Sequence, residues 1–240
     1  MRHWLAGFLL LPVLASAQEG MRIQPEVQRL NAMTARYAPV DIRNDLRAMP
    51  DNERRALASL IHAARVVDAL YLRQAWAGNE ALLLRLLEDE TLLGRARLDY
   101  FLLNKGPWSE LDENKPFIPA VPGRPGGANY YPADATKEQV EAWIAGLPAA
   151  AKAEATGYFT TIRRDGKGRF AAVPYSLEYQ GELAEMARHL RAAAAATRQP
   201  TLKAFLESRA DAFFSNDYYA SDVAWMKLDS TIEPTIGPYE

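Results

Sequence analysis

The sequence contains no cysteine, so disulfide bonds, thiolate catalysis and cysteine-ligated zinc or iron–sulfur sites are excluded from this chain. It also lacks an excess of either charge. The formal net charge of −2 argues against a nucleic-acid-binding protein that depends on a general positive field. No segment recurs at a fixed period, which argues against a repeat protein. Apolar residues are abundant, at 49% of 240, which is enough for a sizeable core in one or two domains.

Histidine is scarce, and this argues against a hydrolytic zinc site. Such a site needs three protein ligands, often supplied by an H-E-x-x-H pattern on a helix. Beyond the N-terminal segment only His62 and His189 remain, and neither is followed by Glu or by a second His one turn later. Both fall in predicted helices. We therefore expect them at the surface or at the edge of the core, and we expect neither metal ligands nor catalytic residues in this chain.

The first residues have the pattern of a secretory signal peptide. Arg2 opens a short positive start, and an apolar run then ends at Leu14, too short for the roughly 20 residues that span a bilayer. Ala15-Ser16-Ala17 forms a small-residue cleavage site. We predict a signal peptide at residues 1–17 and a periplasmic or secreted mature protein. The alternative is an uncleaved membrane anchor.

Apolar residues at spacings of three and four predict a mainly α fold. One of the two longest predicted helices has Asp51 as its N-cap. Its predicted apolar stripe consists of Leu57, Leu60, Ile61, Ala64, Val67 and Tyr71. This helix is expected to form an antiparallel pair with the helix that follows, which Gly94 interrupts. The predicted helices are 27–37, 41–49, 51–76, 79–104, 137–146, 183–198 and 201–215.

Three local signals complete the expected fold. Thr136 and Gln139 fit a capping box at the start of a helix. Residues 157–179 contain two β-rich runs around a glycine-containing loop, which predicts a hairpin. Residues 105–133 are rich in proline and glycine but also carry aromatic side chains, which predicts an ordered loop. The fold class is therefore mainly α with a small β-hairpin (α+β).

Few residues indicate a specific chemistry. The chain has no G-x-S-x-G elbow, and its glycine-rich run at 123–127 lacks the residues of a phosphate loop, so that run is interpreted as a structural turn. A glycosidase needs two acids about 5–10 Å apart. Surface acids are the commoner explanation for such pairs. The candidate pairs are Glu178/Glu182, Asp217/Asp222 and Glu233/Glu240.

Glu233 is singled out among these acids. It lies between Ile232 and Pro234 in an apolar, turn-rich stretch, where a buried carboxylate needs a partner. The sequence stops soon afterwards, without the polar and frayed tail that is usual for a natural terminus. We therefore expect this chain to be the N-terminal portion of a longer protein.

The final stretch IEPTIGPYE (232–240) resembles a segment of the dipeptidyl peptidase III family of zinc peptidases. The order of residues in 181–240, in DYFLLNKGPWSELDENKPFIP (99–119) and in PGRPGGANYYPAD (122–134) is similar to that of the bacterial, signal-bearing branch of the family. The resemblance covers roughly residues 95–240. It implies that the chain forms the first lobe of a two-lobed peptidase.

The resemblance also implies roles for two residues. Glu233 matches the substrate-binding glutamate that holds the free N-terminal ammonium of a peptide. Thr235 stands where better-known members carry a tyrosine that contacts the substrate, so this contact is altered here. The zinc ligands of the family and its catalytic glutamate belong to an HExxGH-type motif and a later acid, and no position of this chain matches them. Zinc is therefore expected only in the full-length protein.

These observations lead to one preferred function and two alternatives. We expect the N-terminal part of an exported zinc-dependent peptidase that, when full-length, removes dipeptides from the N-termini of short peptides. The first alternative is a stand-alone exported helical module that binds peptides or a partner protein without catalysis, through the loop at 105–133. The second is a glycosidase-like enzyme that uses paired acids. An exposed apolar face is expected where a second lobe would dock.

Overall fold

A computed structural model describes residues 25–239, which divide into two compact units. The smaller unit contains residues 25–42 and 78–124, and the larger unit contains 43–77 and 125–239. The predicted signal peptide and Glu240 lie outside the described residues. The prediction that 18–240 form one N-terminal lobe stays a prediction. Among residues 25–239, no helix has both the length and the apolar character that crossing a membrane requires.

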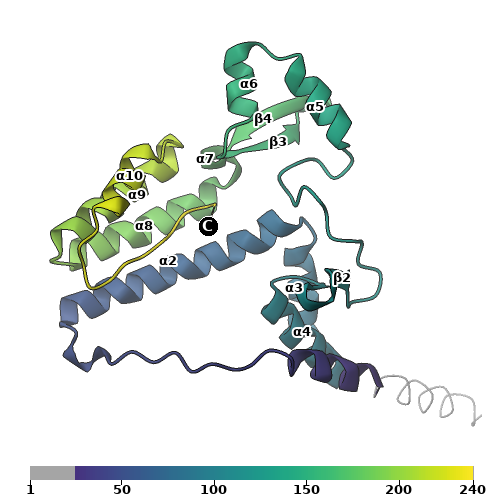
Figure 1. The fold of residues 1–240 in the computed structure, drawn as a ribbon, viewed down its shortest axis with the longest axis horizontal. Coiled ribbons are helices and arrows are strands. Elements are labelled where there is room, and N and C mark those ends of the chain that lie inside the picture. Colours follow the sequence, from purple (N-terminus) through teal and green to yellow (C-terminus); the bar gives the residue numbers. More distant parts are fainter. Residues whose placement is uncertain (1–24, 240) are drawn as a thin grey trace, which may run out of the picture. The chain divides into compact units, whose positions relative to one another are not determined.

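The smaller unit consists of short helices and a two-stranded hairpin (Figure 1). The predicted helix 79–104 is divided, and the break precedes Gly94. The break ends at Thr91, whose side chain accepts a hydrogen bond from the Gly94 N–H at 3.0 Å. Thr91 is therefore the N-cap of the second helix. The elements are a helix at 25–34, α3 (Asn79–Glu88), α4 (Leu92–Asn104), β1 (Trp108–Ser109), the 3₁₀ turn η2 (Glu110–Asp112) and β2 (Lys115–Pro116).

The core of the smaller unit confirms that the first part of the loop predicted at 105–133 is ordered. Trp108 and Phe117, both from that loop, are buried. The Phe117 ring packs edge-on against Tyr100 of α4 with 4.7 Å between ring centres, and the Tyr100 hydroxyl lies 2.6 Å from Ser109 Oγ. The short pairing of β1 with β2 was not predicted, because strands of two residues give no alternating pattern to detect.

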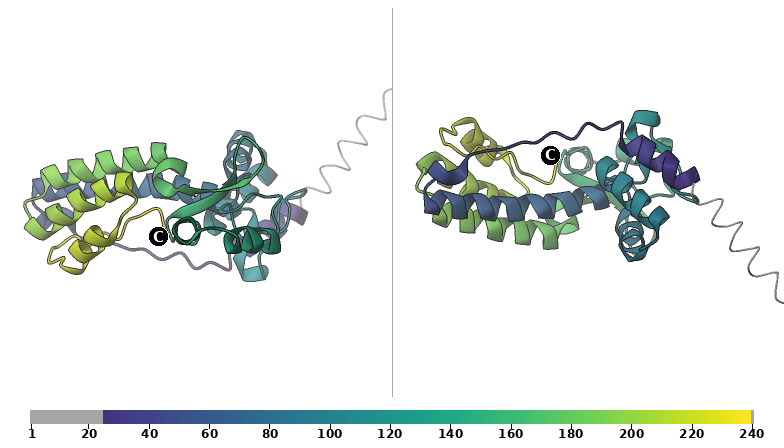
Figure 2. Two further views of the ribbon diagram at one scale, coloured as in Figure 1. Left: turned by 90° about the horizontal axis from the view of Figure 1, so that it is seen from above. Right: turned by 90° about the horizontal axis from the view of Figure 1, so that it is seen from below.

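The larger unit is built on three long helices, α2, α8 and α9, which lie side by side in both figures (Figure 1, Figure 2). The hairpin predicted at 157–179 is present, with β3 antiparallel to β4 and Thr160 opposite Pro174. The elements are the 3₁₀ turn η1 (Leu46–Ala48), α2 (Asp51–Ala75), α5 (Lys137–Ala145), α6 (Ala149–Ala155), β3 (Thr160–Arg164), β4 (Phe170–Pro174), α7 (Tyr175–Glu178), α8 (Gln180–Ala196), α9 (Pro200–Ser215) and α10 (Tyr219–Met226).

The core of the larger unit surrounds α8, which packs against α2 on one side and α9 on the other. The predicted apolar face of α8 is buried as expected, with Leu183, Met186 and Leu190 almost fully enclosed. The prediction that α2 pairs with the following helix was wrong, since its partner is α8.

The buried face of α2 also differs from the predicted stripe. Ile61 and Tyr71 are exposed, whereas Ala56, Ala63 and Leu70 face the core. Buried alanines on both α2 and α8 face the contact between the two helices. The predicted stripe is therefore only partly correct, because Leu60 is buried and Leu57 and Val67 pack against the core.

Two further local predictions were wrong and one was confirmed. Pro50, not Asp51, is the N-cap of α2, and the Asp51 carboxylate instead pairs with Arg54. The helix predicted at 41–49 is reduced to the turn η1. The capping box of α5 is present, with both Thr136 and Gln139 bonded to the backbone.

Candidate functional site

The last described residues of the larger unit form an extended segment, 229–239, that we call the strap. Figure 1 shows it running back beside the three long helices. Its first end is held where α8 gives way to α9. The Thr201 hydroxyl lies 3.0 Å from the Asp229 carbonyl oxygen and 3.1 Å from its N–H. The Thr231 N–H donates to Gln199 Oε1 at 2.7 Å.

The second end of the strap is held near the end of α2. Gln74, which is buried, donates from Nε2 to the Pro238 carbonyl oxygen at 2.6 Å. The Tyr239 ring packs against Phe159 and Tyr218, with ring centres 5.0 and 5.1 Å apart. The strap is therefore anchored by side chains from α2, from the start of α9 and from the residues just before β3 and α10.

Between its anchored ends the strap alternates buried and exposed side chains. Ile232 and Ile236 are buried in the core, whereas Glu233 and Thr235 are exposed. Neighbouring side chains of an extended backbone point to opposite sides, which explains the separation of Glu233 from Ile232. The sequence-based expectation that the Glu233 carboxylate is buried was wrong. Within residues 25–239 it has no hydrogen-bond or ion-pair partner, and it stands in solvent.

Beneath the strap a buried arginine of α9 organises the polar contacts. Arg209 is only 4% exposed, and its Nη2 donates to Asp222 Oδ1 of α10 at 2.6 Å. Its Nη1 donates to the Tyr239 hydroxyl. The guanidinium also lies over the rings of Tyr218 and Tyr239, at 5.6 and 5.7 Å from their centres. Burial raises the pKa of the Tyr218 phenol above its usual range, so this ring is a neutral neighbour for the cation.

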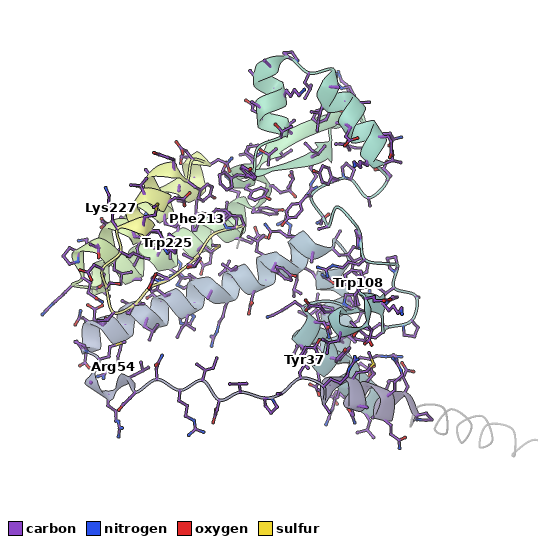
Figure 3. All side chains as sticks on the ribbon, in the orientation of Figure 1. Tyr37, Arg54, Trp108, Phe213, Trp225 and Lys227 are labelled. Carbon is purple, nitrogen blue, oxygen red and sulfur yellow. The ribbon has the colours of Figure 1, made fainter. Side chains whose placement is uncertain are left out.

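A pocket of about 290 Å³ opens beside these groups. Figure 3 shows Trp225 on α10 next to the strap. Thr235 lines the pocket, but Glu233 does not. The complete lining is Arg209, Asp222, Trp225, Met226, Thr235, Ile236 and Tyr239.

The other predicted acid pairs have structural roles. Glu178 receives hydrogen bonds from Arg163 at 3.1 and 2.8 Å, and Glu182 receives one from Arg73 at 2.6 Å. Asp217 accepts the Tyr219 N–H at 3.1 Å at the start of α10. These contacts explain the acids without a hydrolytic role, and Glu240 lies outside the described residues.

The described residues do not fit a zinc site. No group of three or more histidine and acid side chains between residues 25 and 239 is placed to hold a metal ion. His62 and His189 come together across α2 and α8, but their rings stack at 5.3 Å, and His189 Nε2 lies 3.0 Å from Glu185 Oε1.

Sequence reasoning missed the importance of Arg209. Arg209 lies on the buried face of α9. An arginine on the buried face of an amphipathic helix is itself a signal, because a charge there must be paired. The chain offered several acids as partners, so the pairing with Asp222 could not be chosen without the fold.

Comparisons with known proteins give two solved structures and one curated relative. "Structure of dipeptidyl-peptidase III from Corallococcus sp. strain EGB" is 61% identical, with a TM-score of 0.86, and the match covers 88% of this chain and 39% of that one. "Structure of DPP III from Caldithrix abyssi" is 38% identical, with a TM-score of 0.81, and the match covers 85% of this chain and 38% of that one. "Nudix hydrolase 3" of Arabidopsis thaliana is 33% identical over 260 aligned positions.

This chain spans only part of each of these proteins. It covers 34% of the length of the Arabidopsis protein and less than two fifths of either solved chain. No protein-family profile matches it. The resemblance stated from the sequence motifs is confirmed by the two solved structures, and so is the expected α+β fold.

Proposed function

This chain is a relative of dipeptidyl peptidase III, and from that premise we propose that it contributes the part of a peptidase that binds the N-terminus of a peptide. In the whole protein, which we propose to be exported to the periplasm or secreted, this part serves the removal of dipeptides from short peptides. Zinc and the groups that act on the peptide bond are supplied by residues outside this chain. The chain itself binds and orients the substrate.

One observation carries the proposal: the strap holds, in a fixed backbone, a carboxylate that has no partner within residues 25–239. The anchors at Thr231 and Pro238 lie on either side of Glu233, and Ile232 and Ile236 fix the intervening backbone in the core. A peptide ammonium is a strong donor to a carboxylate, because the bond is charge-assisted at both ends. Glu233 is therefore suited to bind the free N-terminus, while Thr235 contacts the residues that follow it.

The first test measures peptide binding by calorimetry. Tripeptides with a free N-terminus are compared with their N-acetylated forms, on the 240-residue chain and on its Glu233→Gln variant. Acetylation and the substitution are each expected to weaken binding by about tenfold or more, since a hydrogen bond between charged groups contributes about 1.5–3 kcal/mol. Applied together they are expected to cost no more than either alone, because both remove the same contact.

Glu207→Gln is the matched control, because Glu207 is an exposed glutamate of α9 whose partner is a surface lysine 3.9 Å away. It is expected to leave the affinity unchanged. Equal binding of free and acetylated peptides by the unsubstituted chain would contradict the proposal.

A second measurement separates binding from catalysis. The purified chain, supplied with zinc and a dipeptidyl-arylamide, is expected to release no arylamine, because residues 25–239 offer no cluster of metal ligands. Release that a chelator abolishes would overturn the assignment of catalysis to residues outside this chain. The alternative of a stand-alone binding module predicts the same results for this chain and differs in having no catalytic part.

A further inference from the structure

The pocket beside Thr235 lies where a peptide held by the strap would place a side chain. Three of its lining residues, Thr235, Ile236 and Tyr239, belong to the strap itself. The others come from α9 and α10, so the pocket extends sideways from the strap toward α10. A peptide that contacts Glu233 and Thr235 therefore has this pocket within reach of one of its first residues.

The walls of the pocket are aromatic and apolar. Trp225 is 38% exposed and Met226 is more exposed still, although both are large apolar side chains. An indole offers a flat face against which another ring packs favourably. The flexible thioether of methionine adapts to rings of different size. These walls favour an aromatic occupant over a small one.

The carboxylate of Asp222, which lines the pocket, can accept a further hydrogen bond. Asp222 Oδ1 accepts hydrogen bonds from Arg209 Nη2 at 2.6 Å and from the Tyr239 hydroxyl at 3.4 Å. Within residues 25–239 its Oδ2 receives no hydrogen bond, and the side chain is 50% exposed. Asp222 can therefore accept a hydrogen bond from a group that enters the pocket.

The charge of Asp222 is already balanced by Arg209. A carboxylate in contact with a guanidinium attracts a second cation less than an isolated carboxylate does, because the arginine repels that cation at short range. A neutral donor such as a phenol or an indole N–H does not meet this repulsion. The pair therefore favours a neutral hydrogen-bond donor.

We propose that this pocket is a side-chain subsite for an aromatic residue that carries a hydrogen-bond donor, tyrosine or tryptophan, in the bound peptide. The ring packs on Trp225 and Met226, and the donor binds Asp222 Oδ2. This assignment rests on the proposed function, because it takes the peptide to be held along the strap. It adds a selectivity for one kind of side chain to the recognition of the N-terminus.

The test uses alanine tetrapeptides with a free N-terminus, in which tyrosine, tryptophan, phenylalanine or lysine is placed at each of the first three positions in turn. At one position tyrosine and tryptophan are expected to bind about tenfold more tightly than alanine. The affinity of the phenylalanine peptide, which lacks the donor, is expected to lie between those of the tyrosine and alanine peptides. The lysine peptide is expected to bind little more tightly than the alanine peptide. The absence of a preference at all three positions, or a preference for lysine above tyrosine, would overturn the proposal.

One variant locates the preference, and another serves as a control. Trp225→Ala removes a wall of the pocket, so the affinity for the tyrosine peptide is expected to fall to that for the alanine tetrapeptide. Tyr219→Ala is the control, because Tyr219 is also an exposed aromatic residue of α10, at 77%, but does not line the pocket. Equal effects of Trp225→Ala and Tyr219→Ala would assign the preference to another surface.

The two proposals fail in different ways. If acetylation of the peptide has no effect but the tyrosine preference persists and depends on Trp225, the role of Glu233 is wrong and the subsite stands. If acetylation weakens binding but no side chain is preferred, the subsite is wrong and the proposed function stands. If the chain binds none of the peptides, both are wrong.

Discussion

At the scale of single residues, buried polar side chains connect parts of the larger unit that are distant in sequence. Glu53, near the start of α2, is 5% exposed and receives hydrogen bonds from Thr197 Oγ1, the Arg198 N–H and Gln199 Nε2, at 2.8 to 2.9 Å. Burial opposes ionisation of this carboxyl, but the hydrogen bonds outweigh it and lower the pKa of Glu53. One carboxylate therefore joins α2 to the turn between α8 and α9.

Glu53→Ala is expected to lower the free energy of unfolding by about 3 kcal/mol, because it leaves these donors without their charged acceptor. Urea denaturation followed by circular dichroism measures the change. Asp51→Ala, two residues earlier, removes only an exposed ion pair and is expected to cost less than about 1 kcal/mol. A similar loss of unfolding free energy for both variants would show that the hydrogen bonds of Glu53 stabilise the fold no more than an exposed ion pair does.

The contribution of Glu53 is expected to depend on pH. Its folded pKa lies below the ordinary value of 4.5, so the stabilisation is complete above pH 4.5 and is lost as the pH falls through the folded pKa. The difference in unfolding free energy between the unsubstituted chain and Glu53→Gln should therefore shrink below pH 4.5. A difference that stays constant down to pH 3 would contradict the assigned ionisation.

Residue-level prediction from the sequence succeeded where the partner is near and failed where it is far. The capping box of Thr136 and Gln139 spans three residues and was predicted correctly. Glu53 meets partners more than 140 residues away, and Arg209 selects Asp222 among many acids. Glu233 was singled out from its place in the chain, and its role stays a prediction. Its exposure depends on which side of the strap faces the core, and only the packing decides that.

At the scale of elements, α8 is the central support of the larger unit. Its regular spacing of apolar residues let the sequence predict both the helix and its buried face. The helices α6, α7 and α10 were missed because each has eight residues or fewer, too few for a periodic pattern. The missed α10 matters most, since it supplies Asp222 and Trp225 to the pocket.

Leu190→Ala tests the central position of α8. Leu190 is fully buried, so removal of its side chain is expected to lower the free energy of unfolding by about 3 kcal/mol through lost burial and a residual cavity. Leu177→Ala makes the same chemical change at a side chain of α7 that is 63% exposed, and it is expected to cost less than about 1 kcal/mol. Equal midpoints of thermal unfolding for the two variants would contradict this account of the core.

At the scale of the whole molecule, the larger unit exposes large apolar side chains. Phe214, Tyr219 and Met226 of α9 and α10 are more than half exposed. Exposed apolar surface of this kind is common where another protein surface packs. The solved relatives are more than twice as long as this chain, so they contain much additional surface that could cover such residues. The exposed apolar face expected where a second lobe would dock stays a prediction.

The isolated chain is expected to self-associate as its concentration rises. Sedimentation velocity should show an increasing weight-average mass, and the double variant Tyr219→Ser, Met226→Lys should reduce that increase. A chain that stays monomeric at every concentration, with or without the substitutions, would contradict the expectation.

The pairing of α2 with α8 also has a consequence for folding during synthesis, because α2 is made well before α8. Synthesis proceeds at about 5–20 residues per second, so on the order of 10 s pass between the appearance of Glu53 and that of its partners after α8. Throughout that interval the apolar side of α2 has no lasting cover. Apolar surface left open in an unfinished chain favours aggregation, which is the physical reason that chaperones bind such chains.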